Sequence, residues 1–482
     1  MASLVQRGSV VSLGSYVITQ VLRLGSNLIL TRLLFQEVFG LTALIQVVLI
    51  GLQLFSDVGI GPSIVQNEKG AKPEFLDTAF TVQLFRGIVL WVLSCLLAYP
   101  FALFYEEPQL VQLLPAAGFS ALLAGLQSTK YWTYRRDLRL GKLAVLDVLV
   151  QVVNIGVMLI LAWIYRSVWA IVISGLLSDV LRTVLTHTWL EGHRDRIRIH
   201  RPSLDSMIRF GRWIFFSTAV SFCVSQTDRL IFGKMASMEV LATYSIAVTL
   251  AAMPSTALWR LTGTVLLPAY SRIIEEKGSL PSEDFLRIRG PMLLAAAWVL
   301  AGFIAGGAVA IELLYDDRYL DAGWMVQLLS MGAWFMVVDA TIAPALLAKG
   351  QSQWVAAANV AKLIGMAVLI PLGYWLGGFP GAVAGYSATE FFRYLLSTLV
   401  IHRQGLGPIP QELRATVLVV VGSGAGWLAS WATRPFVAAP WFQSIVVFLA
   451  VTAVFFPFAK PAIRRFREER RRRRAPVASA PA

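Results

Sequence analysis

Apolar residues run along this chain in long, nearly continuous stretches that short polar or glycine- and proline-containing segments separate. About 20 apolar residues in a helix span a bilayer. The stretches do not alternate with period two, so they predict helices rather than a barrel, the other structure that satisfies its backbone in lipid. We expect an all-α integral membrane protein with fourteen transmembrane helices, near residues 9–34, 40–65, 79–103, 111–130, 143–165, 168–190, 213–231, 239–267, 291–313, 322–347, 353–376, 380–401, 415–433 and 441–459.

The first stretch carries a polar stripe. At about 100° per residue, its polar side chains fall within roughly one third of the helix circumference. A guanidinium in the middle of a span is costly in hydrocarbon and normally faces a bundle interior or a water-filled cavity. The stripe therefore predicts an internal cavity; its residues are Ser12, Tyr16, Thr19, Gln20, Arg23, Ser26 and Asn27.

Charge orients the chain in the membrane. The sequence is 57% hydrophobic and 15% charged, with a mean hydropathy of +0.66 and a net charge of +14. If the N-terminus is cytoplasmic, the inner segments hold thirty Lys and Arg residues and the outer segments hold four. This positive-inside bias places both termini in the cytoplasm. The basic tail at 464–474 then fixes topology or contacts anionic lipid, and no nucleic acid is expected as a partner.

A short repeat relates two parts of the chain at an offset of 202 residues. RLLFQEVFGLTA (32–43) and KMASMEVLATYS (234–245) share a basic first residue and a Glu-Val pair. Six predicted spans separate them, which indicates a parallel repeat of the kind found in transporters with a site between two lobes. We expect an N-terminal lobe at 1–190, a cytoplasmic linker at 191–212, a second lobe at 213–403, two further spans at 404–460 and a basic cytoplasmic tail at 461–482.

Several charges inside the spans have a local explanation. Two pairs, Asp179 with Arg182 and Glu390 with Arg393, are three residues apart and are predicted to pair on their own helices. Lys362 and Asp339 on neighbouring spans are another candidate pair. The four histidines show no metal-ligand spacing, so no metal site is expected.

Three arginines have no acid three or four residues away: Arg23, Arg86 and Arg260. Arg260 lies in a span that Pro254 is expected to break, which would free backbone groups near a cavity. Arginine binds phosphate bidentately, so a cavity with several arginines favours an anion. If Asp228 instead neutralises Arg23, the first helix is a structural seam. The predicted substrate-binding residues are Arg23, Arg86, Arg260, Arg229, Asn27 and Gln20, and the candidate coupling or pairing acids are Asp57, Asp228 and Asp339.

Two segments, 31–66 (TRLLFQEVFGLTALIQVVLIGLQLFSDVGIGPSIVQ) and 225–237 (SQTDRLIFGKMAS), resemble the polysaccharide exporter and oligosaccharide flippase branch of the multidrug/oligosaccharidyl-lipid/polysaccharide superfamily. The resemblance implies an inner-membrane flippase for undecaprenyl-pyrophosphate-linked oligosaccharides, with two lobes rocking around a cationic cavity. It implies no enzyme activity and no cofactor; coupling to a proton or sodium gradient is proposed for relatives, and no motif identifies the ion.

Two other functions are weighed against the flippase. A drug or cation exporter of the same superfamily needs unpaired acids in its cavity, and the balance here is the opposite. A membrane polymerase or ligase usually needs a large outer loop, and no outer loop exceeds about ten residues. The expected partners are the lipid-linked glycan, membrane lipids and a polysaccharide polymerase with other assembly proteins.

Overall fold

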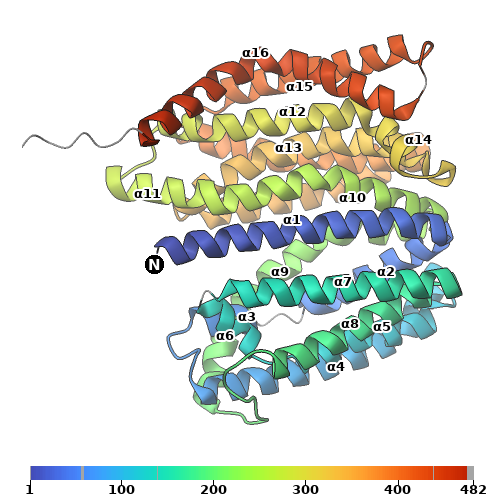
Figure 1. The fold of residues 1–482 in the computed structure, drawn as a ribbon, viewed down its shortest axis with the longest axis vertical. Helices are drawn as coiled ribbons and strands as arrows, with labels where there is room; N and C mark the ends of the chain where they lie inside the picture. The colour runs from blue at the N-terminus through green and yellow to red at the C-terminus, as the bar shows by residue number, and fades with distance from the viewer. Residues whose placement is uncertain (1, 56–58, 138, 438, 475–482) are drawn as a thin grey trace, which may run out of the picture. The chain divides into compact units, whose positions relative to one another are not determined.

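The computed structural model describes residues 2–55, 59–137, 139–437 and 439–474, with side chains except those of 2–17, 55, 210–217, 260, 261, 264, 459 and 461–474. All regular structure in these ranges is helical, which confirms the all-α class (Figure 1). The helices are α1 (Ala2–Leu33), α2 (Gln36–Phe55), α3 (Ile60–Gln66), α4 (Pro73–Tyr105), α5 (Leu110–Gly125), α6 (Lys130–Arg136), α7 (Leu140–Tyr165), α8 (Val168–Thr188), α9 (Arg201–Met235), α10 (Met238–Leu261), the π-helical η1 (Thr262–Leu266), α11 (Leu267–Lys277), α12 (Ser282–Leu314), the 3₁₀ turn η2 (Asp317–Tyr319), α13 (Ala322–Ala348), α14 (Ser352–Arg403), α15 (Ile409–Thr433) and α16 (Pro440–Arg474).

Within the described ranges, ten helices are long and apolar enough to cross a membrane, or up to eleven if α5 and α6, bent by 59°, form one span. The chain is therefore a multi-pass membrane protein. The 52-residue α14 is interrupted at Gly377 and Gly378, where Gly378 has φ 61 and ψ −147. Glycine alone adopts this backbone readily. Its two arms correspond to the predicted spans 353–376 and 380–401, while the total of fourteen stays a prediction.

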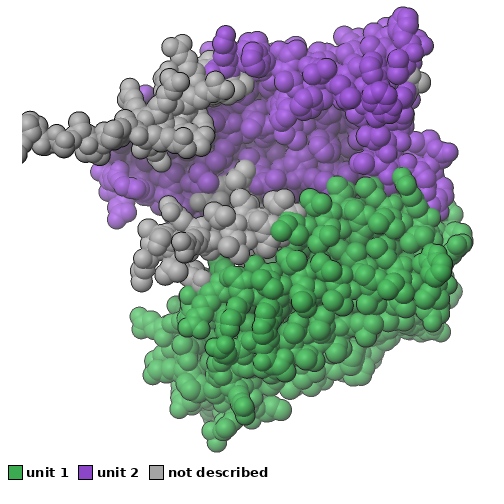
Figure 2. Space-filling view, viewed as in Figure 1, with its two compact units in different colours: residues 1–245 green, residues 246–482 purple. Residues whose placement is uncertain are grey.

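The chain divides into two compact units, residues 1–245 and 246–482 (Figure 2). In unit 1 (residues 1–245), α4 packs against α5, α7 packs against α8 and α1, and α2 packs against α9. A small apolar core beneath α3 includes Ile60, Ile64 and Phe75, each at most 3% exposed. This core fixes the short helix α3 against α4 and α6.

The helix ends in unit 1 carry the predicted repeat. α1 ends at Leu33 and α9 at Met235, while α2 begins at Gln36 and α10 at Met238, so the same offset of 202 residues separates both pairs. The two turns also touch each other, because a Cβ atom on Gly40 would lie 2.2 Å from the Met238 carbonyl oxygen. The structure thus supports the repeat in helix boundaries as well as in sequence.

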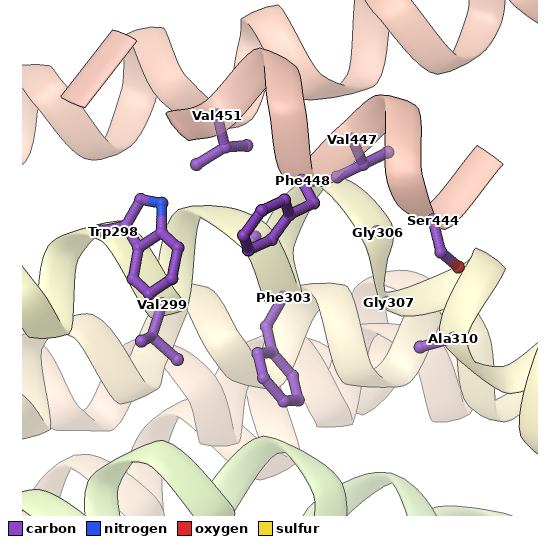
Figure 3. Close-up of a pocket in the computed structure, with 11 residues that line it drawn as sticks. Trp298, Val299, Phe303, Gly306, Gly307, Ala310, Ser444, Val447, Phe448 and Val451 are labelled. Atoms are coloured by element: carbon purple, nitrogen blue, oxygen red, sulfur yellow. The ribbon is translucent and has the colours of Figure 1, made fainter. Parts of the chain in front are cut away.

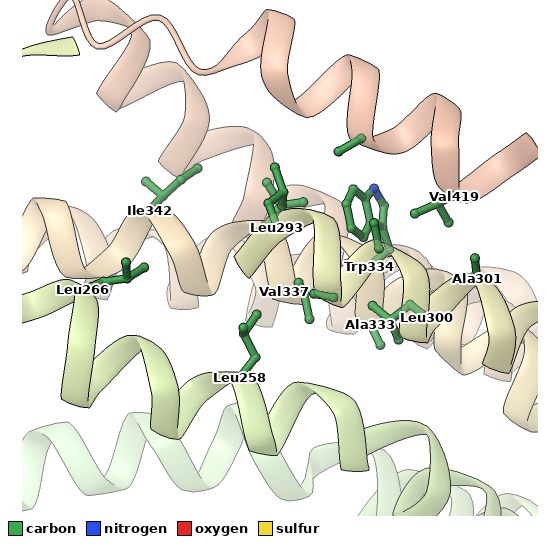
Figure 4. Packing of buried hydrophobic residues seen from close by; sticks show 14 of the residues in the cluster. Leu258, Leu266, Leu293, Leu300, Ala301, Ala333, Trp334, Val337, Ile342 and Val419 are labelled. Atoms are coloured by element: carbon green, nitrogen blue, oxygen red, sulfur yellow. The ribbon is translucent and has the colours of Figure 1, made fainter. Parts of the chain in front are cut away.

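In unit 2 (residues 246–482), α12 is the central helix and packs against α13, α15 and α16, while α13 packs against α14. Figure 4 shows the apolar core that joins them, with Leu300 of α12, Val337 of α13 and Val419 of α15. Leu300 and Val337 are fully buried. The indole of Trp334 belongs to this core and satisfies its N–H by donating to Thr416 Oγ1 at 3.0 Å.

The predicted break at Pro254 is wrong. α10 continues through Pro254 to Leu261, and the irregularity follows as the π-helical turn Thr262–Leu266. Membrane helices tolerate proline because neighbouring groups satisfy the freed carbonyl. The side chain of Arg260, two residues before η1, lies outside the described residues.

Candidate functional site

The break between α2 and α3 lies at the edge of the candidate site. Gly59 adopts a left-handed conformation there, with φ 64 and ψ 36. Arg86 of α4 donates from Nη2 to the Gln53 carbonyl at 2.6 Å, and Thr218 of α9 donates from Oγ1 to the Leu54 carbonyl at 2.8 Å. Arg86, predicted as an anion ligand, therefore also holds the end of α2.

A cavity of about 410 Å³ lies beside this break, inside unit 1. Guanidinium groups from two helices reach it, Arg86 from α4 and Arg182 from α8. Neither Asp nor Glu is found among the described residues that line it. A water occupies about 30 Å³ of liquid, so the cavity has room for a hydrated phosphate group. Its polar and aromatic lining residues are Gln53, Gln83, Arg86, Gln127, Ser128, Tyr131, Trp132 and Arg182.

The wall of the cavity is built at the bend between α5 and α6. Gln83 of α4 donates from Nε2 to the carbonyls of Ala124 at 2.9 Å and Gln127 at 3.0 Å, which satisfies the end of α5. The Trp132 ring lies against Gly61, where a Cβ atom would come within 2.6 Å of the ring. These contacts fix the polar lining in place. No local sequence pattern predicts them, because each joins residues that are far apart along the chain.

Arg136 fastens α6 to the end of α3. Its Nη1 donates to the carbonyls of Ile64 at 2.7 Å and Asn67 at 2.5 Å, and its Nη2 to that of Glu68 at 3.3 Å. The last carbonyls of a helix lack partners within it and carry partial negative charge. A guanidinium is thus used here as a helix cap, not as a ligand.

Arg182 was expected to pair with Asp179 on its own helix, and this prediction is wrong. Its Nη1 donates to Asp147 Oδ1 of α7 at 2.7 Å, with the two side chains 26% and 36% exposed. The second oxygen of Asp147 accepts a long hydrogen bond, 3.4 Å, from the Tyr131 hydroxyl. Because α7 and α8 pack together, the carboxylate on the neighbouring helix takes the place of the one on the same helix.

In unit 2 the structure brings four charged side chains into one buried cluster. Glu390 and Arg393 pair as predicted, Nη2 to Oε2 at 2.8 Å. Lys362 pairs with Glu390 Oε1 at 2.7 Å and not with Asp339, so that prediction is wrong. Asp339 lies 3.3 Å from Arg393 Nε instead. All four side chains are 5–7% exposed, and their formal charges sum to zero.

The α1 stripe is only partly tested. The Arg23 side chain is exposed in the described structure, and Gln20 and Asn27 are half-buried. Ser26 is buried and donates from Oγ to the Arg23 carbonyl at 3.0 Å. Asp57 lies outside the described residues, like the side chain of Arg260, so the predicted roles of both stay predictions.

Asp228 and Arg229 at the end of α9 have local partners. Asp228 is 2% exposed and accepts a hydrogen bond from the Tyr244 hydroxyl at 2.7 Å. Arg229 is half-buried, and its Nη1 donates to Gln226 Oε1 at 3.4 Å. No ion pair links Asp228 to Arg23 among the side chains that the structure describes.

A second cavity, of about 270 Å³, lies in unit 2 between α12 and α16 (Figure 3). Its described lining is apolar apart from Ser444 and the indole N–H of Trp298. Gly306 of α12 makes room for Val447 of α16, whose Cγ1 would lie 3.2 Å from a Cβ atom there. No charged side chain is found among its described lining residues, so its chemistry suits hydrocarbon and not an anion.

Among sequence relatives, the chain is 21% identical over 386 residues to the lipopolysaccharide biosynthesis protein WzxC of Escherichia coli (strain K12), a match that covers 79% of this chain and 77% of that protein. It is 22% identical over 301 residues to the teichuronic acid biosynthesis protein TuaB of Bacillus subtilis (strain 168). The second match covers 62% of each protein, less than two thirds of the relative.

Solved structures show the fold. The lipid II flippase MurJ in an inward closed conformation superposes with a TM-score of 0.70 at 12% identity, covering 95% of this chain and 99% of that one. A multidrug resistance MATE family transporter of the MOP superfamily, inward-facing, gives a TM-score of 0.63 at 12% identity, covering 83% and 95%. The helical fold is thus of the MurJ and MATE kind. Residues 29–324, more than half of the chain, match the family described as polysaccharide biosynthesis protein, and the chain belongs to this family.

Proposed function

We propose that this protein is a flippase that moves an undecaprenyl-pyrophosphate-linked oligosaccharide from the cytoplasmic to the outer leaflet, for surface polysaccharide biosynthesis. One observation carries the proposal: two guanidinium groups, Arg86 and Arg182, line a polar cavity inside a membrane-spanning helical unit. Relatives named for lipopolysaccharide and teichuronic acid biosynthesis support the substrate class. A protein of similar fold is named a lipid II flippase, which supports the type of transport.

The proposed architecture has fourteen spans in the bacterial inner membrane, with both termini in the cytoplasm. Its lobes are residues 1–190 and 213–403, joined by the linker 191–212 and followed by spans 13 and 14. Support comes from the charge bias between inner and outer segments and from the helix boundaries that repeat at 202 residues.

The proposed chemistry is recognition of the pyrophosphate by arginine. A guanidinium stays charged at every physiological pH and donates two parallel hydrogen bonds to phosphate oxygens. Glutamine amides and the Tyr131 hydroxyl, with fixed hydrogen-bond geometry, suit the hydroxyl groups of sugars. On sequence grounds Arg23 and Arg260 join the same anion site, with Arg229, Gln20 and Asn27 beside it.

Energy for directed transport would come from an ion gradient, of protons or sodium. Asp57, Asp228 and Asp339 are the candidate acids for coupling; Asp339 already contacts Arg393 and Asp228 accepts from Tyr244. The protein carries no catalytic role in this proposal. A polysaccharide polymerase and other assembly proteins would receive the flipped glycan.

The experiment replaces Arg86 by Ala and by Lys in cells that lack the chromosomal copy of this gene. We expect Arg86→Ala to lose surface polysaccharide and to accumulate lipid-linked precursor at an equal amount of membrane protein. Arg86→Lys should be intermediate, because it keeps the charge and one donor but loses the planar fork. Arg272→Ala is the matched control, since Arg272 forms an exposed pair with Glu276 on α11.

Three results would contradict the proposal. Normal polysaccharide output from a stably inserted Arg86→Ala variant would mean that the cavity takes no part in transport. Precursor that reaches the outer leaflet but is not polymerised would indicate a polymerase or ligase, and loss of drug resistance with intact polysaccharide would indicate a drug exporter.

A further inference from the structure

The ion pair between Arg182 and Asp147 stands at the wall of the cationic cavity. Arg182 lines the cavity, whereas Asp147 is not one of its described lining residues. The contact uses one guanidinium nitrogen, Nη1, at 2.7 Å. No further hydrogen bond or ion pair of Arg182 is found within the described part of the chain. The remaining N–H groups of this side chain, 26% exposed, are thus available to a ligand in the cavity.

The buried arginine of unit 2 provides a contrast. Arg393 is 7% exposed and contacts two carboxylates, Glu390 at 2.8 Å and Asp339 at 3.3 Å. A pair of this kind cannot exchange a partner without leaving a buried charge uncompensated. Arg182 contacts one carboxylate, through one nitrogen, and its side chain is 26% exposed beside the cavity. The two arginines therefore differ in whether their partner can be replaced.

A phosphate group is a stronger partner for Arg182 than the Asp147 carboxylate, and this difference favours exchange. Half-exposed ion pairs with a single contact contribute little, because water competes for both groups. A phosphate group presents several oxygens and pairs with a guanidinium through two parallel hydrogen bonds, which are shorter and stronger than a single one. A pyrophosphate in the cavity would therefore displace Asp147 from Arg182.

We propose that Asp147 is the resident counter-ion of Arg182 and that the anionic group of the substrate replaces it on binding. The inference rests on the proposed function, because it takes the ligand to be the pyrophosphate of a lipid-linked glycan. In the empty protein Asp147 compensates the charge of Arg182 inside the membrane-spanning unit. In the loaded protein the displaced carboxylate competes with the ligand, so it weakens binding and speeds release.

The test compares variants of the full-length protein in lipid nanodiscs. Asp147→Asn removes the charge but keeps the shape and one oxygen, which accepts from Arg182, while its amide nitrogen faces the Tyr131 hydroxyl. Asp147→Ser is a second variant that guards against a folding defect. The matched control is Glu191→Gln, which removes a carboxylate from an exposed ion pair with Lys142 of the same helix α7. The probes are inorganic pyrophosphate and farnesyl pyrophosphate, whose affinities are measured by calorimetry.

We expect Asp147→Asn to bind both probes about tenfold more tightly than the wild type, which corresponds to about 1.4 kcal/mol. Glu191→Gln should bind like the wild type. Arg182→Ala should bind more weakly, and adding Asp147→Asn to it should give no gain, because the competitor acts through Arg182. A gain for farnesyl pyrophosphate alone would assign the effect to the isoprenoid and overturn the exchange.

Unchanged or weaker binding by both Asp147 variants would also overturn the exchange, since Asp147 would then position Arg182 instead of competing with the ligand. This failure is distinct from a failure of the proposed function. If the wild type binds the probes and transports the glycan while Asp147→Asn binds them no more tightly, only the proposed exchange is refuted. If neither the wild type nor Asp147→Asn binds either probe, both the pyrophosphate site and the exchange are refuted.

Discussion

Glu390→Gln tests how much the buried charge cluster of unit 2 contributes to the stability of the protein. Glu390 accepts a hydrogen bond from Lys362 Nζ at 2.7 Å and forms an ion pair with Arg393 Nη2 at 2.8 Å, and its side chain is 7% exposed. The variant leaves two buried cations with one carboxylate, Asp339. Removing one partner from a buried ion pair costs about 3–5 kcal/mol, because the remaining charge stays out of water. At roughly 2–4 °C per kcal/mol for a unit of this size, the apparent melting temperature should fall by about 10 °C.

The assay is the apparent melting temperature of purified protein in one detergent, read by fluorescence-detected size exclusion. Glu276→Gln is the matched control, because its i,i+4 pair with Arg272 is exposed and contributes little to stability. Adding Lys362→Met to Glu390→Gln restores charge balance and should recover most of the loss. If Glu390→Gln costs no more than Glu276→Gln, or if the second change brings no recovery, the cluster does not hold α13 and α14 together by charge.

Three further predictions concern unit 1. Gly40→Ala should destabilise the protein, because its Cβ would meet the Met238 carbonyl oxygen at 2.2 Å, whereas Gly25→Ala has open space and should be neutral in the same melting assay. Arg136→Met should speed amide hydrogen exchange in residues 60–68, since it frees the carbonyls at the end of α3, and unchanged exchange would contradict the cap. Lys234→Cys, in a variant without native cysteines, should react with an impermeant thiol reagent from outside; protection until lysis would contradict the topology.

Much of the helical architecture follows from apolar run length alone. The repeat of the Glu-Val pair at Glu37 and Glu239 also located two equivalent turns, and the helix ends match it. The irregular backbone was harder to predict. Pro254 is a strong local signal, yet α10 runs through it, while α3 begins after Gly59, which adopts a left-handed conformation. Breaks in membrane helices depend on distant partners that a local pattern does not contain.

The candidate site shows the same limit. Spacing of three residues predicted the Glu390–Arg393 pair correctly but failed for Arg182, whose partner Asp147 is on the neighbouring helix. An i,i+3 rule ranks only groups on one helix. It therefore assigned Arg182 to a structural pair and left it out of the predicted site. Comparing the in-span acids of adjacent helices, and not only of the same helix, would have brought Asp147 into consideration.

Charged residues inside a membrane protein are costly, so each needs a physical reason to be there. The contacts that each guanidinium makes distinguish two such reasons, joining helices and binding a ligand. Arg393 contacts two carboxylates and is 7% exposed, so its charge serves to join α13 and α14. Arg182 is 26% exposed, with one contact to a carboxylate and the rest of its donors toward a cavity of about 410 Å³. A protein that only needed to hold α7 to α8 could do so with well-packed apolar side chains in place of this pair, which is often neutral or stabilising. The pair is instead kept partly exposed beside a polar cavity, and the anion recognition that we propose gives a reason to keep it there.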